Sequence, residues 1–153
     1  MPAERPTFHR VLVAVDGSTH SDLALAMAIA LADRDHARLA VLTVIPNITE
    51  NTGALAYGAA VDPVQLQEDA DQGAAKTMRA AIDAVPEGQP VDSVTRRGSS
   101  GSEIVAQIKE GDHDVVILGA RGLGRIGSLF GSVSQYVLHH AGIAAFVAHA
   151  PED

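Results

Sequence analysis

The sequence has no cysteine and few aromatic residues, and each shortage removes a class of chemistry. Without cysteine there is no disulfide, no thiol nucleophile and no zinc site built on thiolates. Aromatic residues make up 3% of the chain, too few for a stacking platform of the kind that binds single-stranded nucleic acid. Small apolar residues, above all alanine and valine, are abundant instead. They favour helices packed closely on a sheet.

Basic residues and long apolar runs are also scarce. The chain has 11 Lys and Arg against 19 Asp and Glu, a net charge of −8, so we expect neither nucleic acid nor an anionic membrane as a partner. No apolar run approaches the ~18 residues of a membrane span. Residues 1–9 lack the apolar core of a signal peptide and are interpreted as a polar leader, so we expect a cytoplasmic protein.

Short apolar runs alternate with helical patterns over residues 10–150, which predicts one domain. Strands are predicted at 10–15, 38–45, 91–97, 114–118 and 143–148. Helices are predicted at about 20–34, 63–85, 102–110 and 132–141, with a long connection at 46–62. The inward stripe of the first helix is predicted as Leu23, Met27, Ala30 and Leu31, and that of the last as Val133, Val137 and His140.

This alternation predicts an α/β fold, a three-layer, doubly wound, Rossmann-like parallel sheet of five strands. Right-handed crossovers restrict the topology, and the strand order 3-2-1-4-5 is our prediction. Ligands of such sheets bind at the carboxyl ends of the strands, where the order reverses. Asp16 follows the first strand and Gly119 ends the fourth, so both should face that crevice.

A loop with five glycines and two arginines follows the fourth strand and leads into the last helix. Glycine lets backbone N–H groups approach an anion closely, and the helix start adds its own unpaired N–H groups. Arg121 and Arg125 carry planar charged groups that suit phosphate. Ser132 can cap the helix or donate to a phosphate oxygen. The loop therefore predicts a phosphate site, although a plain turn is the alternative.

Better-known nucleotide and enzyme motifs do not match. No lysine precedes Ser128 as a P-loop requires, and the glycine loop does not follow the first strand as in a dinucleotide fold. There is no GxSxG elbow and no HExxH pair. Adjacent His139 and His140 would point about 100° apart on a helix, so they do not share a metal face.

The residues at these positions resemble the universal stress protein family along essentially the whole chain. The resemblance rests on three segments of the sequence: Val13-Ala-Val-Asp16-Gly-Ser18, Leu42-Thr-Val44, and Ile117-Leu-Gly-Ala-Arg-Gly122 followed by Gly131-Ser-Val-Ser134. The ATP-binding branch of that family carries two glycines separated by two residues, nine further residues, and then glycine with serine or threonine. Gly119, Gly122 and Gly131-Ser132 match, with eight residues in the gap.

The resemblance implies an adenine nucleotide alpha hydrolase-like fold and a role for each matched position. Asp16 and the backbone of Val44 would meet the adenine, Ala14 and Val15 would wall the base, and Leu118 and Gly119 would lie under the ribose. Gly122, Gly131, Ser132 and Val133 would donate to the phosphates of ATP. Mg²⁺ could accompany ATP, held mainly by phosphate oxygens and water. Arg121 and Arg125 are added to this site from their charge alone.

The resemblance also bears on partners and activity. Strand 143–148 is apolar and should lie at a sheet edge, where antiparallel pairing with a second copy would cover it, as family members commonly do. The function expected is ATP binding in a stress response, without enzymatic turnover. A nucleotide-independent dimeric interaction module and a slow ATPase are the alternatives, and neither the physiological nucleotide nor a lid role for 46–62 follows from the sequence.

Overall fold

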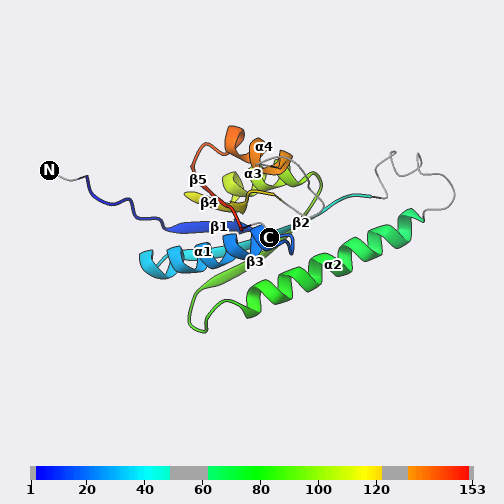
Figure 1. The fold of residues 1–153 in the computed structure, drawn as a ribbon, viewed down its shortest axis with the longest axis horizontal. Coiled ribbons are helices and arrows are strands. Elements are labelled where there is room, and N and C mark those ends of the chain that lie inside the picture. The colour runs from blue at the N-terminus through cyan, green and yellow to red at the C-terminus, as the bar shows by residue number, and fades with distance from the viewer. Residues whose placement is uncertain (1–2, 49–61, 122–130, 152–153) are drawn as a thin grey trace.

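Five strands and four helices alternate along the chain in the computed structural model, which describes residues 3–48, 62–121 and 131–151 (Figure 1). The strands are β1 (Arg10–Ala14), β2 (Arg38–Ile45), β3 (Val91–Arg97), β4 (Val115–Gly119) and β5 (Ala144–Ala148). The helices are α1 (Thr19–Asp35), α2 (Pro63–Asp83), α3 (Ser100–Glu110) and α4 (Ser132–His140). The predicted connection 46–62 and the predicted glycine loop lie largely outside the described residues.

All strand pairs are parallel, and the order is β3-β2-β1-β4-β5, which confirms the predicted topology. Two helices cover each face of the sheet: α1 and α2 lie on one side, and α3 and α4 on the other (Figure 1). The strand order reverses between β1 and β4. The carboxyl ends of these two strands therefore flank the position where a doubly wound fold binds its ligand.

The two faces of the sheet are buried by alternate residues of the same strands. Val11 and Val13 of β1 pack under α1, whereas Leu12 between them packs under α3 and α4. Strands buried on both faces read as continuous apolar runs, and this is why β1, β2 and β4 could be recognised in the sequence. The edge strand β3 alternates between half-buried and exposed residues, as predicted.

The predicted inward stripes of α1 and α4 were wrong in part. Leu31, Val133 and Val137 pack on the core as predicted, whereas Leu23, Met27, Ala30 and His140 are exposed. In α1, Leu23 and Met27 are 36% and 37% exposed, and the residues that face the sheet are the small Ala24, Ala28 and Ala32 together with Leu25. Alanine lets the helix approach the strands closely, so the larger residues turn outward. In α4, His140 is exposed and stacks on Tyr136, and Ala141 is buried instead. In α2 and just after it, the residues that pack on the sheet are Met78, Ala81, Ile82 and Val85, and in α3 they are Ile104, Val105 and Ile108.

Carboxylates anchor the chain just before β1. Asp35, whose side chain is fully buried, accepts from the Phe8 backbone N–H at 2.9 Å and from Arg34 at 2.7 Å. The hydrogen bond from Arg34 and then that from Phe8 lower the pKa of Asp35 to about 2. Asp114 accepts from the His9 and Arg10 N–H groups at 2.8 and 3.0 Å. The end of the polar leader is therefore held against the domain.

No helix among the described residues is both long and apolar enough to cross a membrane.

A buried histidine lies at the amino end of β4, opposite the predicted ligand crevice. His113 is 7% exposed, its Nε2 is 3.3 Å from the Gln107 side-chain nitrogen, and its Nδ1 has no hydrogen-bond partner among the described residues. Burial lowers the pKa of His113 below 6.5, and the charge of Arg10 lowers it further, against smaller opposing effects of the Arg10 backbone, Asp114 and Asp112. The folded protein therefore favours neutral His113.

We expect His113 to make folding pH-dependent. Its folded-state pKa is lowered, so its destabilising effect is absent above the unfolded pKa of about 6.5 and grows as pH falls toward the folded pKa. In His113→Gln, stability should fall less between about pH 8 and pH 5 than in the native chain, by urea unfolding. An equal loss of stability in both proteins would contradict this account.

Candidate functional site

A cavity of about 410 Å³ opens at the carboxyl ends of β1, β2 and β4, where the strand order reverses. Its volume falls in the range of small-molecule sites, about 300–1,000 Å³. The residues that line it come from every layer of the fold: Ala14, Val15, Asp16, Ser21, Leu42, Val44, Pro46, Ser100, Ile104, Leu118, Gly119, Arg121, Gly131, Val133 and Ser134. Most of the lining is apolar, and polar groups lie toward the turn after β1 and toward α4.

One end of the cavity is formed by β2, which is longer than β1. The last registered pair of the two strands is Ala14 with Leu42, and the Leu42 carbonyl accepts from the Val15 N–H at 2.9 Å. Backbone groups of alternate residues in a parallel strand face the same neighbour. Val44 therefore faces the side of β1, beyond the last β1 residue, and its N–H and C=O point toward the cavity. Ile45 faces the other way, and its carbonyl accepts from the Gly98 N–H.

The turn between β1 and α1 is locked by its own polar groups. The Asp16 carboxylate accepts from the Ser18 N–H at 2.9 Å, and Gly17 takes a positive φ of 86° that favours glycine. The Ser18 hydroxyl oxygen caps α1 by accepting from the Ser21 N–H at 3.2 Å. The Ser21 hydroxyl oxygen accepts from the Asp16 N–H, also at 3.2 Å. Asp16 is thus held in place at the cavity wall.

Gly119, the last residue of β4, lies directly against the start of α1. A Cβ built on Gly119 would lie 2.8 Å from His20 C and His20 Cβ and 2.9 Å from Ser21 N. These are backbone atoms or atoms next to the backbone, so they cannot move aside as a flexible side-chain tip could. Only glycine lets β4 end beside α1, and this close approach brings the turn after β1 and the turn after β4 into one cavity.

The amino end of α4 forms the other end of the cavity. Its N-cap residue is Gly131, which provides no side-chain hydrogen bond to the first turn. The Gly131 N–H donates to the Ala120 carbonyl at 2.7 Å. The Ser134 hydroxyl donates to the carbonyls of Gly119 and Ala120, at 3.0 and 2.8 Å. These bonds hold the helix start against the end of β4, where the helix dipole favours an anion.

Arg121 brings positive charge to this end. Its Nη2 lies 3.5 Å from His20 Nε2, and the opposite ring nitrogen of His20, Nδ1, accepts from the Ala150 N–H at 3.0 Å. That hydrogen bond requires an unprotonated Nδ1. The Ser18 hydroxyl donates to the Arg121 carbonyl at 3.5 Å, a long contact.

Nine of the twelve predicted site residues line the cavity. They are Ala14, Val15, Asp16, Val44, Leu118, Gly119, Arg121, Gly131 and Val133. Ser132 is exposed at the first position of α4 and is not part of the lining. The predicted Gly122 and Arg125 lie outside the described residues. The ligand roles of all twelve stay predictions.

Sequence reasoning missed six lining residues: Ser21, Leu42, Pro46, Ser100, Ile104 and Ser134. Two of them carried a signal, because Ser21 stands three residues after the cap Ser18 and Ser134 is part of the Gly131 segment. Ser100 and Ile104 come from α3, which reaches the cavity only through packing. No group of three or more acidic or histidine side chains that could hold a metal occurs among the described residues.

The fold and the position of the cavity define a doubly wound, Rossmann-like α/β domain with a cavity at the switch point. The Universal stress protein family model matches residues 7–149. The chain therefore belongs to the universal stress protein family.

Curated relatives and solved structures agree with this assignment. A universal stress protein of Synechocystis is 30% identical over 142 residues, covering 87% of this chain and 92% of that protein. One from Thermus aquaticus is 33% identical, covering 88% and 93%. The structure of UspA from Lactobacillus plantarum superposes with a TM-score of 0.78 at 24% identity, covering 94% of this chain and 99% of that one. At this identity the structural likeness supports the fold.

We expect Gly119→Ala to destabilise the protein by about 1–3 kcal/mol, because the new methyl group would overlap the backbone of α1. Gly73→Ala is the matched control. Gly73 lies inside α2 with nothing within 4 Å of a built Cβ, so alanine there should stabilise by about 0.5–1 kcal/mol. Urea unfolding measures the free energy of unfolding of both variants and of the native chain. If Gly119→Ala is as stable as Gly73→Ala, the structure accommodates the new methyl group and the close contact does not require glycine.

Proposed function

We propose that this protein binds ATP in the cavity at the carboxyl ends of β1, β2 and β4 and acts as a regulatory stress-response protein. The observation that carries the proposal is the joining of two kinds of surface in one cavity. A strand end with an exposed donor and acceptor forms one side, and a glycine-capped helix start with an arginine forms the other. An adenine nucleotide has a matching base and phosphate tail.

The base would lie at the β2 end. Ala14 and Val15 supply apolar walls there, and the N–H and C=O of Val44 pair with the edge of adenine, which offers one acceptor beside one donor. The Asp16 carboxylate lies at the same cavity wall, where it accepts from the adenine amino group or lies beside the base. Leu118 and Gly119 lie under the ribose.

The phosphates would lie at the α4 end. Backbone N–H groups of Gly131, Ser132 and Val133 donate to them, with help from the helix dipole. Arg121 supplies positive charge to this part of an otherwise acidic protein. Gly122 and Arg125 extend the same role into the glycine loop, and Mg²⁺ would arrive with ATP on its phosphate oxygens.

Ligands of structural neighbours support an adenine nucleotide. A universal stress protein of Archaeoglobus fulgidus is solved in complex with dAMP, with a TM-score of 0.67 at 20% identity over 94% of this chain and 99% of that one. Another universal stress protein is solved in complex with cAMP, with a TM-score of 0.59 at 23% identity over 94% and 98%. Both ligands share adenine with ATP.

Little or no turnover is expected at this site. Hydrolysis needs a base that can activate water beside the terminal phosphate. Asp16 is the one carboxylate among the described lining residues, and it belongs to the turn after β1 rather than to the α4 end. The protein would therefore hold ATP as a regulator does. We propose that it acts in the cytoplasm.

We expect saturable ATP binding by calorimetry, and an adenine nucleotide released from the purified protein by denaturation. Arg121→Gln should weaken ATP about ten- to a hundredfold, the loss of one charged hydrogen-bonding group, while adenosine affinity stays the same. Arg79→Gln, at an exposed position of α2, is the control.

Two results would contradict this proposal. Absence of saturable binding at millimolar ATP would remove the nucleotide role and leave an interaction module. Turnover of about one per second or faster would make the protein an enzyme.

We also propose that two copies pair antiparallel through β5. This strand lies at the sheet edge, and its Phe146 is 41% exposed although it packs edge-on against Phe8, with ring centroids 6.1 Å apart. An apolar edge strand favours pairing with a second strand, which would satisfy its outward backbone groups. The short strand and the two rings would form the centre of the interface.

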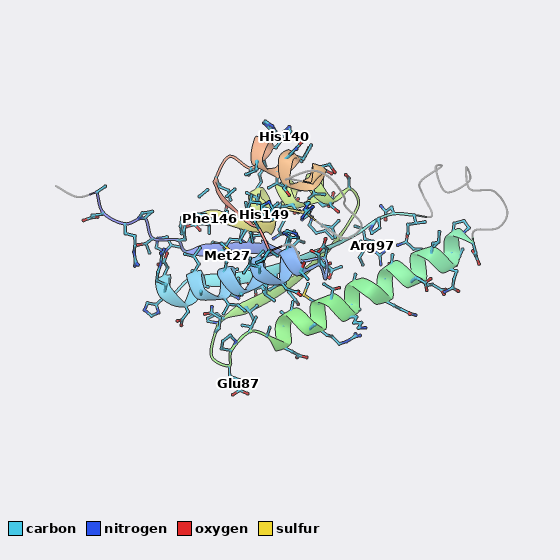
Figure 2. The ribbon with its side chains drawn as sticks, viewed as in Figure 1. Met27, Glu87, Arg97, His140, Phe146 and His149 are labelled. Atoms are coloured by element: carbon cyan, nitrogen blue, oxygen red, sulfur yellow. The ribbon has the colours of Figure 1, made fainter. Side chains whose placement is uncertain are left out.

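We expect Phe146→Lys to shift the protein from dimer to monomer in sedimentation experiments. The two-fold axis would bring the two introduced lysines close together, and their like charges would repel. Glu87→Gln changes the net charge by the same amount at an exposed turn between α2 and β3 and should leave the assembly unchanged. Figure 2 shows Phe146 and Glu87 far apart on the molecule. A native chain that sediments as a monomer would end this part of the proposal.

A further inference from the structure

The first residues after β2 are held by one side chain from α2. Gln67 accepts from the Ile48 N–H at 2.8 Å through its Oε1 and donates to the Pro46 carbonyl at 3.0 Å through its Nε2. The side-chain amide therefore pairs with the backbone on both sides of Asn47, as a neighbouring strand would. Pro46 is itself a lining residue of the cavity, two residues after Val44.

A charged pair fixes Gln67 in turn. Its Nε2 also donates to Asp71 one helical turn further along α2, at 3.0 Å. Both oxygens of Asp71 accept from the Arg97 guanidinium, at 3.0 and 3.2 Å. The hydrogen bond from Arg97, and then that from Gln67, lower the pKa of Asp71, which keeps it charged at neutral pH. Arg97 is the last residue of β3 and lies on the side of the sheet toward α2 (Figure 2).

These polar contacts lie along the first half of α2, which packs little against the hydrophobic core. The part of α2 that packs on the sheet is its second half, with Met78, Ala81 and Ile82, whereas Val64 is 59% exposed. Figure 1 shows the first half of α2 extending beyond the sheet. The hydrophobic core therefore does not place the chain from Pro46 to Ile48, and the hydrogen bonds of Gln67 do.

We propose that Gln67 is the positioning residue for the β2 end of the cavity, where the backbone of Val44 would meet the base, and that it thereby helps to select adenine. This inference rests on the ATP-binding function proposed above. Val44 carries the backbone groups that would face the base, and Gln67 sets where the chain runs just beyond Val44, as it leaves the sheet. Gln67 acts through the backbone and does not itself touch the nucleotide.

Base selection is sensitive to this position because the two purines differ in polarity. Adenine presents an acceptor beside an amino donor, whereas guanine presents a donor beside an acceptor. A strand end held in one register can pair its N–H and C=O with adenine. Guanine in the same position would set donor against donor and acceptor against acceptor. A binding group must be held within about 0.5 Å of its productive position, so releasing the Pro46–Ile48 segment should cost adenine binding first.

The test compares Gln67→Met with Gln65→Met in the full chain. Methionine keeps the length and helix preference of glutamine and removes its hydrogen bonds. Gln65 lies on the same helix but is exposed and bonds only to Asp69 among the contacts that the structure shows. Dissociation constants for ATP, GTP and inorganic tripolyphosphate are measured by calorimetry, with thermal unfolding to show that each variant is folded.

We expect Gln67→Met to weaken ATP about tenfold, leave tripolyphosphate unchanged and reduce the preference for ATP over GTP by a similar factor. Gln65→Met should match the native chain in all three. Arg97→Met removes the hydrogen bonds to Asp71, which in turn holds Gln67. It should therefore reduce the preference for ATP over GTP less than Gln67→Met does. It also serves as the second variant, because the Arg97 side chain is half exposed and its loss should leave the protein folded.

Opposite outcomes separate the two proposals. If the native chain binds ATP and Gln67→Met keeps the native preference for ATP over GTP, the role of Gln67 is wrong while the nucleotide function stands. The same holds if ATP, GTP and tripolyphosphate weaken equally, because that pattern indicates a general loss of structure. If the native chain binds no ATP, the proposed function fails, and this inference fails with it.

Discussion

The start of α1 lies against the last residue of β4, and the two fit because Gly119 has no Cβ. This contact joins parts of the chain that are about a hundred residues apart in sequence. It brings the Asp16–Ser18 turn beside the end of β4, where Ser134 and Gly131 bond to the backbone. Without the close approach, the turn after β1 and the start of α4 would face solvent separately and enclose no cavity.

The cavity is rigid on one side and held by polar contacts on the other. Around Gly119, backbone bonds and capping hydroxyls leave little freedom. On the β2 side, the sheet ends at Ile45, and the chain beyond it is held by Gln67 of α2. The base of a nucleotide would therefore meet the more adjustable wall and its phosphates the fixed one. Phosphate binding is common to all nucleotides, whereas selection among bases depends on the adjustable wall.

The nucleotide-binding role proposed above would give these features a common purpose. A regulator that holds a nucleotide needs a site that reports occupancy to another surface. The Ala120 N–H donates to the Ala148 carbonyl at 2.8 Å, and Ala150 bonds to His20. The end of the edge strand β5 is thus bonded to both turns that form the cavity. A partner on β5 and a ligand in the cavity would share this connection.

The sequence by itself determined the order of strands and helices, the topology and nine of the cavity residues. Apolar runs and glycine turns are local signals, and parallel crossovers have one hand. Leu23 and Met27 of α1 were wrongly predicted to face inward, because close packing places alanine where hydrophobicity alone favours larger residues, and His140 of α4 was likewise predicted wrongly. Only the tertiary structure brought Ser100, Ile104 and Gln67 to the site. Their positions depend on how α2 and α3 pack on the sheet, which no short stretch of sequence encodes.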